Sequence, residues 1–458
     1  MRLQSPWRPR LADEEAGSAC DRLVAALSED IVTGQLDVGA RLPAHRDLAW
    51  RLGLGLGTVT KAYGTLERRG LIRSVKGRGT FVAVAEARRH SFIDLSRNAP
   101  PAALTERLLA RSLTAVAKRI NTNVFNSYPP AAGHARYRHA LARWFRRIGM
   151  DADPERLLLT NGAQHALSIS LSVLCGRGGR LFVEEQTYPG AITLARHLGI
   201  DLVVVAMDAE GMIPAALDQA LCGAKGGNRA IYLTPTMQNP TTGSMSRARR
   251  EAIAGISRRR DAVVIEDDIY ALCVDDAFPP IASIAPDHVF YINSLSKTLN
   301  PALRVGGLVV PHRWLVRVEA ALHASGLMIS PLSCSVMEQW LLDDTADAIS
   351  AAIQQEALRR RRLAGAILGD AMRRPVHLGY HVWLPLPRME ADDLEHAAKA
   401  LGIIVTPPSA TAAGDGNAGI RLCIGAPAAS ELERALEGVR TILDRIGARP
   451  DAVSSAVR

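Results

Sequence analysis

The chain has 458 residues, of which 48% are hydrophobic and 22% are charged, and no long tract is biased in composition. This length exceeds what one core usually holds, so two or three globular domains are expected. No run of about twenty apolar residues lacks charges, and the N-terminus has no apolar export segment. A membrane-spanning or exported protein is therefore not expected, and the composition favours the cytoplasm.

The six cysteines are scattered along the chain, and none stands in a CxxC or Cys/His ligand pattern. We therefore expect a reducing compartment and no bound metal. The net charge of +9 is concentrated, because residues 41–90 hold eleven Lys/Arg against three acidic residues. Such a segment suits a polyanionic partner, although a solvated basic surface fits the charge equally well.

The first eighty-five residues predict three helices and a hairpin. Apolar residues from Leu23 to Val32 form one helical stripe, and RDLAWRLG predicts a short helix that ends at Gly53. A third helix is predicted from about Thr58 to Arg69, followed by the strands LIRSV and TFVAV around a KGRG turn. Two helices in a helix-turn-helix arrangement followed by a basic hairpin are typical of a winged helix-turn-helix.

Three motifs of this segment resemble the GntR family of bacterial transcription regulators. They are GxxxxGxRLPxxRDLAxxLG (Gly34–Gly53), TVTKAY (Thr58–Tyr63) and GRGTFV (Gly77–Val82). The resemblance implies that the third helix enters the major groove of double-stranded DNA; a winged helix used only for protein contacts is the alternative. The DNA-binding residues implied in this way are Arg46, Thr58, Thr60, Lys61, Lys76 and Arg78.

From about residue 125 onward, short apolar strands alternate with helical segments. The strands RLFVEE, DLVVVAM, AIYLTP, AVVIEDD and HVFYINS indicate a mostly parallel α/β sheet. Ligands of such sheets lie beyond the carboxyl ends of the strands. Polar residues follow the strands here: Ala163 and Gln164 begin a helix, Tyr188 follows a strand, and Asn239 stands in a turn. Each of these alone also fits an ordinary cap, core or turn residue.

Two later strand ends are more specific. Asp267 ends the strand VVIED, where a carboxylate can pair with a protonated ring nitrogen, and the phenol of Tyr270 follows three residues later. In YINSLSKTLNPALR, two hydroxyls and a guanidinium, those of Ser294, Ser296 and Arg304, can bind a phosphate. Lys297 lies among them.

Lysine is rare in this chain, with only six residues: Lys61, Lys76, Lys118, Lys225, Lys297 and Lys399. Arginine cannot form a Schiff base, so an arginine-rich chain needs lysine where a primary amine is required. Only Lys297 follows a strand among phosphate-type ligands. A solvated surface lysine remains possible on composition alone.

The order of these motifs over residues 93–445 is similar to that of fold-type I aminotransferases. The resemblance implies pyridoxal 5′-phosphate (PLP) as the cofactor, bound as a Schiff base to Lys297, with Asp267 on the ring nitrogen and Arg421 on a substrate carboxylate. It also implies Asn239 and Tyr270 at the ring oxygen and Tyr188 on the ring face. Phosphate ligands implied are Ala163, Gln164, Ser294, Ser296 and Arg304, with Tyr128 from a neighbouring subunit.

A winged helix ahead of such a domain resembles the MocR-type subfamily of GntR regulators. We expect a DNA-binding domain at 14–84, a linker at 85–92, a large part at 125–312, a smaller α+β part at 313–445 and a disordered tail at 446–458. The resemblance implies a homodimeric regulator that senses an amine, an amino acid or PLP itself. A working aminotransferase with an accessory DNA-binding domain is the alternative, because the groups needed for transamination are present.

Overall fold

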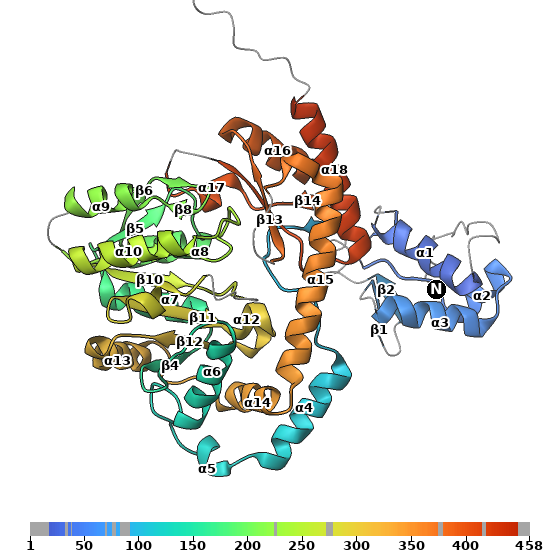
Figure 1. Ribbon diagram of the computed structural model, residues 1–458. Coiled ribbons are helices and arrows are strands. Elements are labelled where there is room, and N and C mark those ends of the chain that lie inside the picture. Colours follow the sequence, from blue (N-terminus) through green and yellow to red (C-terminus); the bar gives the residue numbers. More distant parts are fainter. Residues whose placement is uncertain are drawn as a thin grey trace, which may run out of the picture. The chain divides into compact units, whose positions relative to one another are not determined.

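The chain folds into two compact units, Met1–Ile93 and Asp94–Arg458, each with a hydrophobic core of its own (Figure 1). The computed structural model describes residues 18–32, 35–37, 39–68, 71–75, 79–82, 92–223, 227–271, 278–373, 379–414 and 418–447. Within these ranges no single helix is long and apolar enough to cross a membrane; one bent pair, His312–Gly326 with Pro331–Leu342, passes by length and composition only.

The first unit is a winged helix-turn-helix, as the sequence predicts. Its core contains the apolar stripe of the first helix and the inner side of the third, with Leu23, Leu27, Val59 and Leu66 fully buried. The second helix ends where Gly53 adopts a left-handed φ of 64°, which glycine does without steric cost. The elements are α1 Ala19–Val32, α2 His45–Leu52, α3 Leu56–Arg68, β1 Ile72–Val75 and β2 Gly79–Val82.

The second unit is built on a seven-stranded sheet of order β4-β12-β11-β10-β9-β5-β6. The pairs β5–β6, β5–β9, β9–β10 and β10–β11 are parallel, whereas β12 runs antiparallel to both its neighbours. The predicted mostly parallel sheet is therefore confirmed, with one reversed strand. The strands are β4 Leu157–Thr160, β5 Arg180–Glu184, β6 Asp201–Val205, β9 Arg229–Leu233, β10 Val263–Asp267, β11 Val289–Ser294 and β12 Gly306–Val309.

Helices cover both faces of this sheet, so its strands are buried on both sides. Alternation along β10 sends Ile265 to the core shared with α7, α8 and α13, and sends Glu266 toward Arg250 of α10 on the opposite face. Helix α6 packs on that second face, where Phe145 meets Tyr291 edge to face. The helices are α6 Ala135–Arg147, α7 Ala163–Leu174, α8 Pro189–Leu198, α9 Pro214–Gly223, α10 Arg247–Arg260, α11 Ile281–Ile284, α12 Leu295–Thr298 and α13 Leu315–Gly326, with 3-10 turns η3 Pro301–Leu303 and η4 His312–Trp314.

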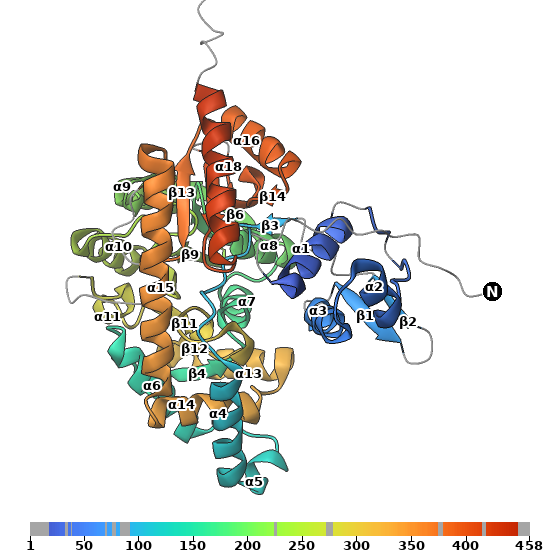
Figure 2. The same cartoon turned by 90° about the vertical axis from the view of Figure 1, so that its right-hand side faces the viewer.

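A smaller α+β lobe completes the unit. Helices α15 and α18 lie side by side in both views (Figures 1 and 2), and Arg440 of α18 donates to the Leu368 carbonyl at 3.3 Å. The antiparallel pair β13–β15 and the pair β3–β14 supply its strands. Remaining elements are β3 Ile93–Asp94, α4 Glu106–Arg119, α5 Thr122–Phe125, β7 Met207–Asp208, β8 Gly211–Met212, α14 Pro331–Leu342, α15 Thr345–Leu368, η5 Gly369–Ala371, β13 His381–Pro385, α16 Arg388–Ala400, β14 Ile403–Ile404, α17 Pro408–Thr411, β15 Gly419–Cys423 and α18 Ala429–Gly447.

Candidate functional site

Lys297 lies in the one-turn helix α12, directly beyond the carboxyl end of β11. The Ser294 hydroxyl caps this turn by accepting from the Ser296 amide at 3.1 Å. The Lys297 ammonium donates to the backbone carbonyl of Asn98, and the Tyr380 hydroxyl donates to the Lys297 carbonyl at 3.1 Å. Burial disfavours the charged amine and lowers the pKa of Lys297 to about 8. Lys297 is therefore a desolvated amine inside the fold, not a surface charge.

Asp267 ends β10, the strand beside β11. Its Oδ2 accepts a hydrogen bond from the Tyr232 hydroxyl at 2.9 Å. Its Oδ1 is buried and has no hydrogen-bond partner among the described residues. Burial, reinforced by the adjacent charge of Asp268, raises the pKa of Asp267 to about 7. A buried carboxylate oxygen without a partner is costly, so this position suits a cationic N–H donor from a ligand.

Asn239 and Tyr270 meet beside Arg421, at the lobe boundary. The Asn239 amide nitrogen donates to the Tyr270 hydroxyl at 3.4 Å, and Arg421 Nη1 donates to Asn239 Oδ1 at 2.7 Å. Arg421 Nη2 also donates to the Ser96 carbonyl at 3.0 Å and to the Thr406 hydroxyl at 3.1 Å. This guanidinium is nearly buried yet contacts only neutral acceptors among the described residues. It can therefore take a carboxylate as an additional partner.

A cradle for an anion lies at the N-terminus of α7. Gly162 precedes that helix with a φ of +81°, which favours glycine, and a Cβ there would lie 2.6 Å from Arg304 Nη2 and displace that side chain. Arg304 donates to the Asn161 carbonyl at 2.9 Å and to Ser296 Oγ at 3.5 Å, and Ser294 Oγ donates to Ser296 Oγ at 2.9 Å. Free helix N–H groups, hydroxyls and a guanidinium together suit a phosphate.

The remaining predicted ligands divide into two groups. Ala163 and Gln164 begin α7, and the Tyr188 hydroxyl donates to Gln164 Oε1 at 3.0 Å. These residues border the cradle. Tyr128, by contrast, is 80% exposed, and no contact within the described part of the chain joins it to the other predicted site residues. Its assignment to a neighbouring subunit stays a prediction.

Asn98 and His381 also belong to this site, although neither stands in a sequence motif that predicts a site. The Asn98 amide nitrogen lies 2.8 Å from the Tyr270 hydroxyl and 3.2 Å from His381 Nδ1. Burial lowers the pKa of His381 to about 3, so its ring is neutral. These residues position Tyr270 and Lys297. The histidine and tyrosine rings lie 5.2 Å apart.

The residues present fit PLP. The unpartnered Asp267 Oδ1 suits a protonated pyridine nitrogen, the buried Lys297 amine suits the aldehyde carbon, and the Gly162 cradle suits the phosphate. When bound, PLP supplies an aldehyde that condenses with primary amines and an electron-withdrawing ring. With PLP bound, Asp267 would keep the ring nitrogen charged, Arg421 would orient a carboxylate, and Lys297 would hold or release a proton.

The depressed pKa of Lys297 predicts how cofactor uptake depends on pH. With a pKa of about 8, roughly a tenth of the amine is neutral at pH 7, far more than for an exposed lysine. We expect the rate of PLP uptake by cofactor-free protein to rise as pH approaches 8 and to level off above it. Stopped-flow absorbance between pH 6.5 and 10 measures this. A rate that still climbs at pH 10 would mean that the amine titrates like an exposed lysine.

The first unit presents a candidate nucleic-acid interface on its second and third helices. Arg46, Thr60 and Lys61 are exposed, and Thr58 is half-buried at the start of α3. His45 Nδ1 lies 3.2 Å from the Thr60 hydroxyl, which connects α2 to α3. The Tyr63 hydroxyl donates to the Pro43 carbonyl at 2.9 Å and anchors α3 from its buried side.

The wing carries the other predicted phosphate ligands, Lys76 and Arg78, which lie outside the described residues. The two wing strands pair from Ile72 with Val82 to Val75 with Gly79. The Arg41 side chain lies against Gly79, where a Cβ would stand 2.9 Å from its Nε. Arg41 was not singled out from the sequence, and it adds an exposed cation near the wing.

The Lys297 site, at the carboxyl ends of a mostly parallel sheet, defines the second unit as a PLP-binding domain of the aminotransferase type. Residues 90–439 match the family "Aminotransferase class I and II", and the chain belongs to this family, whose members depend on PLP. Residues 20–82 match "Bacterial regulatory proteins, gntR family". The two domains in this order form the MocR-type architecture.

Similar proteins support the same classification. YdeF of Bacillus subtilis, an uncharacterized HTH-type transcriptional regulator, is 29% identical over 96% of this chain and 97% of its own length. PdxR of Corynebacterium glutamicum, named a pyridoxine biosynthesis transcriptional regulator, is 26% identical over 82% of this chain and 84% of its own.

Among solved structures, the kynurenine aminotransferase of Pyrococcus horikoshii covers 80% of this chain and 95% of its own, with a TM-score of 0.71 and 20% identity. This likeness concerns the fold. The named relatives favour a PLP-dependent, DNA-binding regulator of transcription over an aminotransferase with an accessory domain.

Proposed function

We propose that the chain senses an amine, an amino acid or PLP itself at Lys297 and changes its affinity for promoter DNA accordingly. The observation that carries this proposal is a buried amine and an unpartnered carboxylate oxygen in one site, in a chain that also carries a DNA-binding domain. PdxR, a relative named for pyridoxine biosynthesis, supports vitamin B6 compounds among the effectors. A regulator that binds bacterial promoters acts in the cytoplasm.

Arg421 narrows the class of effector. Its guanidinium is held by Asn239 and Thr406 at the lobe boundary, where it can bind a carboxylate. An effector with both a primary amine and an acidic group would engage Lys297 and Arg421 together. Because Arg421 belongs to the small lobe and Lys297 to the large lobe, such an effector would favour one arrangement of the two lobes over others.

DNA binding is tested by its dependence on salt. Neutralised phosphates release counterions, so the affinity for the chain's own upstream promoter should fall linearly on logarithmic axes as salt rises. We expect Arg46→Ala and Lys61→Ala each to reduce this slope by about 1. Lys118→Ala, an exposed lysine of the other unit, is the matched control. Unchanged slopes in both variants would contradict the assignment of these residues to phosphates.

A homodimer is the proposed assembly. The segment α4–α5 exposes Leu109, Leu113 and Phe125, and Tyr128 follows with most of its ring in solvent. An exposed apolar surface of this kind is typical of an interface. We expect Leu109→Glu with Leu113→Glu to shift sedimentation toward the monomer, and Leu401→Glu, a distant exposed leucine, to leave it unchanged. A wild type that sediments as a monomer would contradict the proposal.

A further inference from the structure

A second cleft, separate from the Lys297 site, lies where the two lobes of the second unit meet. Its volume is about 820 Å³, within the range of about 300–1,000 Å³ typical of small-molecule pockets. The large lobe contributes Glu185, Asp208 and Thr241, and the small lobe contributes Arg373 and Trp383. None of the residues assigned above to PLP lines this cleft.

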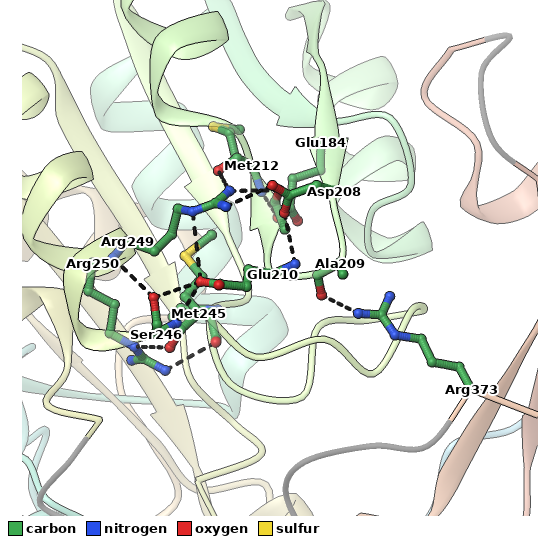
Figure 3. Close-up of polar contacts among 12 residues, drawn as sticks. Glu184, Asp208, Ala209, Glu210, Met212, Met245, Ser246, Arg249, Arg250 and Arg373 are labelled. Carbon is green, nitrogen blue, oxygen red and sulfur yellow. Dashed lines mark hydrogen bonds and ion pairs between the residues drawn. The ribbon is translucent and has the colours of Figure 1, made fainter.

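Two of the four charged side chains in the cleft are already paired. Asp208 Oδ2 accepts from Arg249 Nη2 at 2.7 Å, and Arg388 donates from Nε to Asp392 at 2.9 Å. Figure 3 shows Arg249 reaching both Asp208 and Glu210, which fixes the turn that forms one wall. The charges of Asp208 and Arg388 are therefore already paired within the protein.

The other cation, Arg373, is available to a ligand. It donates to the Ala209 carbonyl across the cleft (Figure 3), and it forms no ion pair with a carboxylate among the described residues. Burial lowers the pKa of this half-buried guanidinium, and the nearby charge of Asp208 acts in the opposite direction. Gly243 leaves room for it, because a Cβ there would lie 3.2 Å from Arg373 Nη2 and 2.7 Å from the Ala209 oxygen. Its remaining donors suit a carboxylate.

The other anion, Glu185, is available as well. Its backbone carbonyl accepts from the Ala413 amide at 2.9 Å, which fixes the residue, whereas its carboxylate has no partner among the described residues. Apolar groups also line the cleft, including Met207, Trp383 and Leu386. The cation of Arg373, the anion of Glu185 and the apolar lining are complementary to the carboxylate, the ammonium and the side chain of a zwitterion with an apolar side chain.

We propose that this cleft binds an α-amino acid as an intact zwitterion, with its carboxylate on Arg373, its ammonium on Glu185 and its side chain against Trp383. The site forms no covalent bond and uses no cofactor, so it stands independently of the function proposed for Lys297. Two residues that line the cleft are adjacent to residues of the Lys297 site. Gln186 precedes Tyr188 by two residues, and Trp383 pairs with Arg421 across β13 and β15. We therefore expect occupancy of the cleft to influence the cofactor site, and such coupling would be reciprocal.

The test uses N,N-dimethyl-L-leucine, a zwitterion whose tertiary amine cannot condense with an aldehyde, titrated calorimetrically into the PLP-loaded full-length protein. We expect one site per chain and a loss of about tenfold or more in affinity in Arg373→Gln and, separately, in Glu185→Gln. Arg388→Gln, whose side chain is already paired with Asp392, should bind as the wild type does. Glu185→Gln removes a half-exposed charge, so it tests the site even if Arg373→Gln folds poorly.

Three results would overturn the proposal. The first is a wild type that takes up no N,N-dimethyl-L-leucine. The second is binding that is lost in Arg421→Gln but kept in Arg373→Gln, which would place the probe at the cofactor site. The third is equally tight binding of 4-methylpentanoate, which lacks the amine and would reduce the cleft to a site for simple anions.

Discussion

Replacing Lys297 by alanine is expected to abolish covalent attachment of PLP completely. The Lys297 amine is desolvated and lies beside Asn98 and Tyr270, whereas other described lysines such as Lys61, Lys118 and Lys399 are exposed. Borohydride treatment of PLP-loaded wild type should place a single reduced label on the peptide that contains Lys297. The visible absorption band of the loaded protein should be absent in Lys297→Ala.

Lys399→Ala is the matched control for this experiment, because it removes an exposed lysine of the same unit. It should retain both the label and the absorption band. A label on any other peptide, or a colourless wild type that gains no band with added PLP, would exclude Lys297 as the attachment point.

The Asp267→Asn variant is expected to bind PLP about a hundredfold more weakly, or worse, at pH 8. The amide keeps the shape of the side chain and can still accept from Tyr232, but it cannot balance a protonated ring nitrogen. Breaking a buried charge pair costs about 3–5 kcal/mol, which corresponds to at least a hundredfold change in affinity. Equilibrium dialysis against PLP measures the loss.

A second variant checks the size of this loss, and a stability measurement separates the loss from unfolding. Tyr232→Phe removes only the hydrogen bond to Asp267 and should weaken binding about tenfold. Because burial raises the pKa of Asp267 from its ordinary value of 3.8 to about 7, the cost of burying this carboxylate in the cofactor-free fold grows between those two pH values and is fully present at pH 8, whereas the amide avoids it. Cofactor-free Asp267→Asn should therefore unfold at no lower temperature than wild type at pH 8. Unchanged PLP affinity would contradict the role of Asp267.

The site residues at the strand ends could be predicted from the sequence, because each follows an apolar run that indicates a buried strand. The parallel sheet then brings these residues together at one edge. Strands β5, β9, β10 and β11 are consecutive neighbours in the sheet and parallel, so the residues that follow them meet. This is why Tyr188, Asn239, Asp267 and Lys297 lie in one region, as expected from the local patterns.

The reversed strand β12 was not predicted, because two glycines interrupt its apolar pattern. A Cβ on Gly307 would lie 2.8 Å from the Phe145 ring, and one on Gly306 would lie 2.9 Å from the Gly162 carbonyl carbon. Glycine is required at both positions because other elements, distant in the sequence, pack closely against them. Glycine in a strand pattern otherwise suggests a bulge or turn.

Asn98 and His381 were missed for a similar reason. Asn98 lies 199 positions before Lys297 and 283 before His381. Neither Asn98 nor His381 stands in a sequence motif that indicates a functional role. Their roles come from the folding of the small lobe against the large one. The charge pattern of the second cleft, Glu185 and Arg373, is likewise defined only by which neighbouring charges are already paired.

The central claim is that the chemical state of the Lys297 site controls DNA binding. It is tested most directly by fluorescence anisotropy with the chain's own upstream promoter fragment at fixed salt, comparing cofactor-free and PLP-loaded protein. We expect the wild-type affinity to differ between the two states by about fivefold or more, as is typical of allosteric coupling, and the affinity of Lys297→Ala to be the same with and without PLP. Equal wild-type affinities in both states, or an undiminished response in Lys297→Ala, would contradict it.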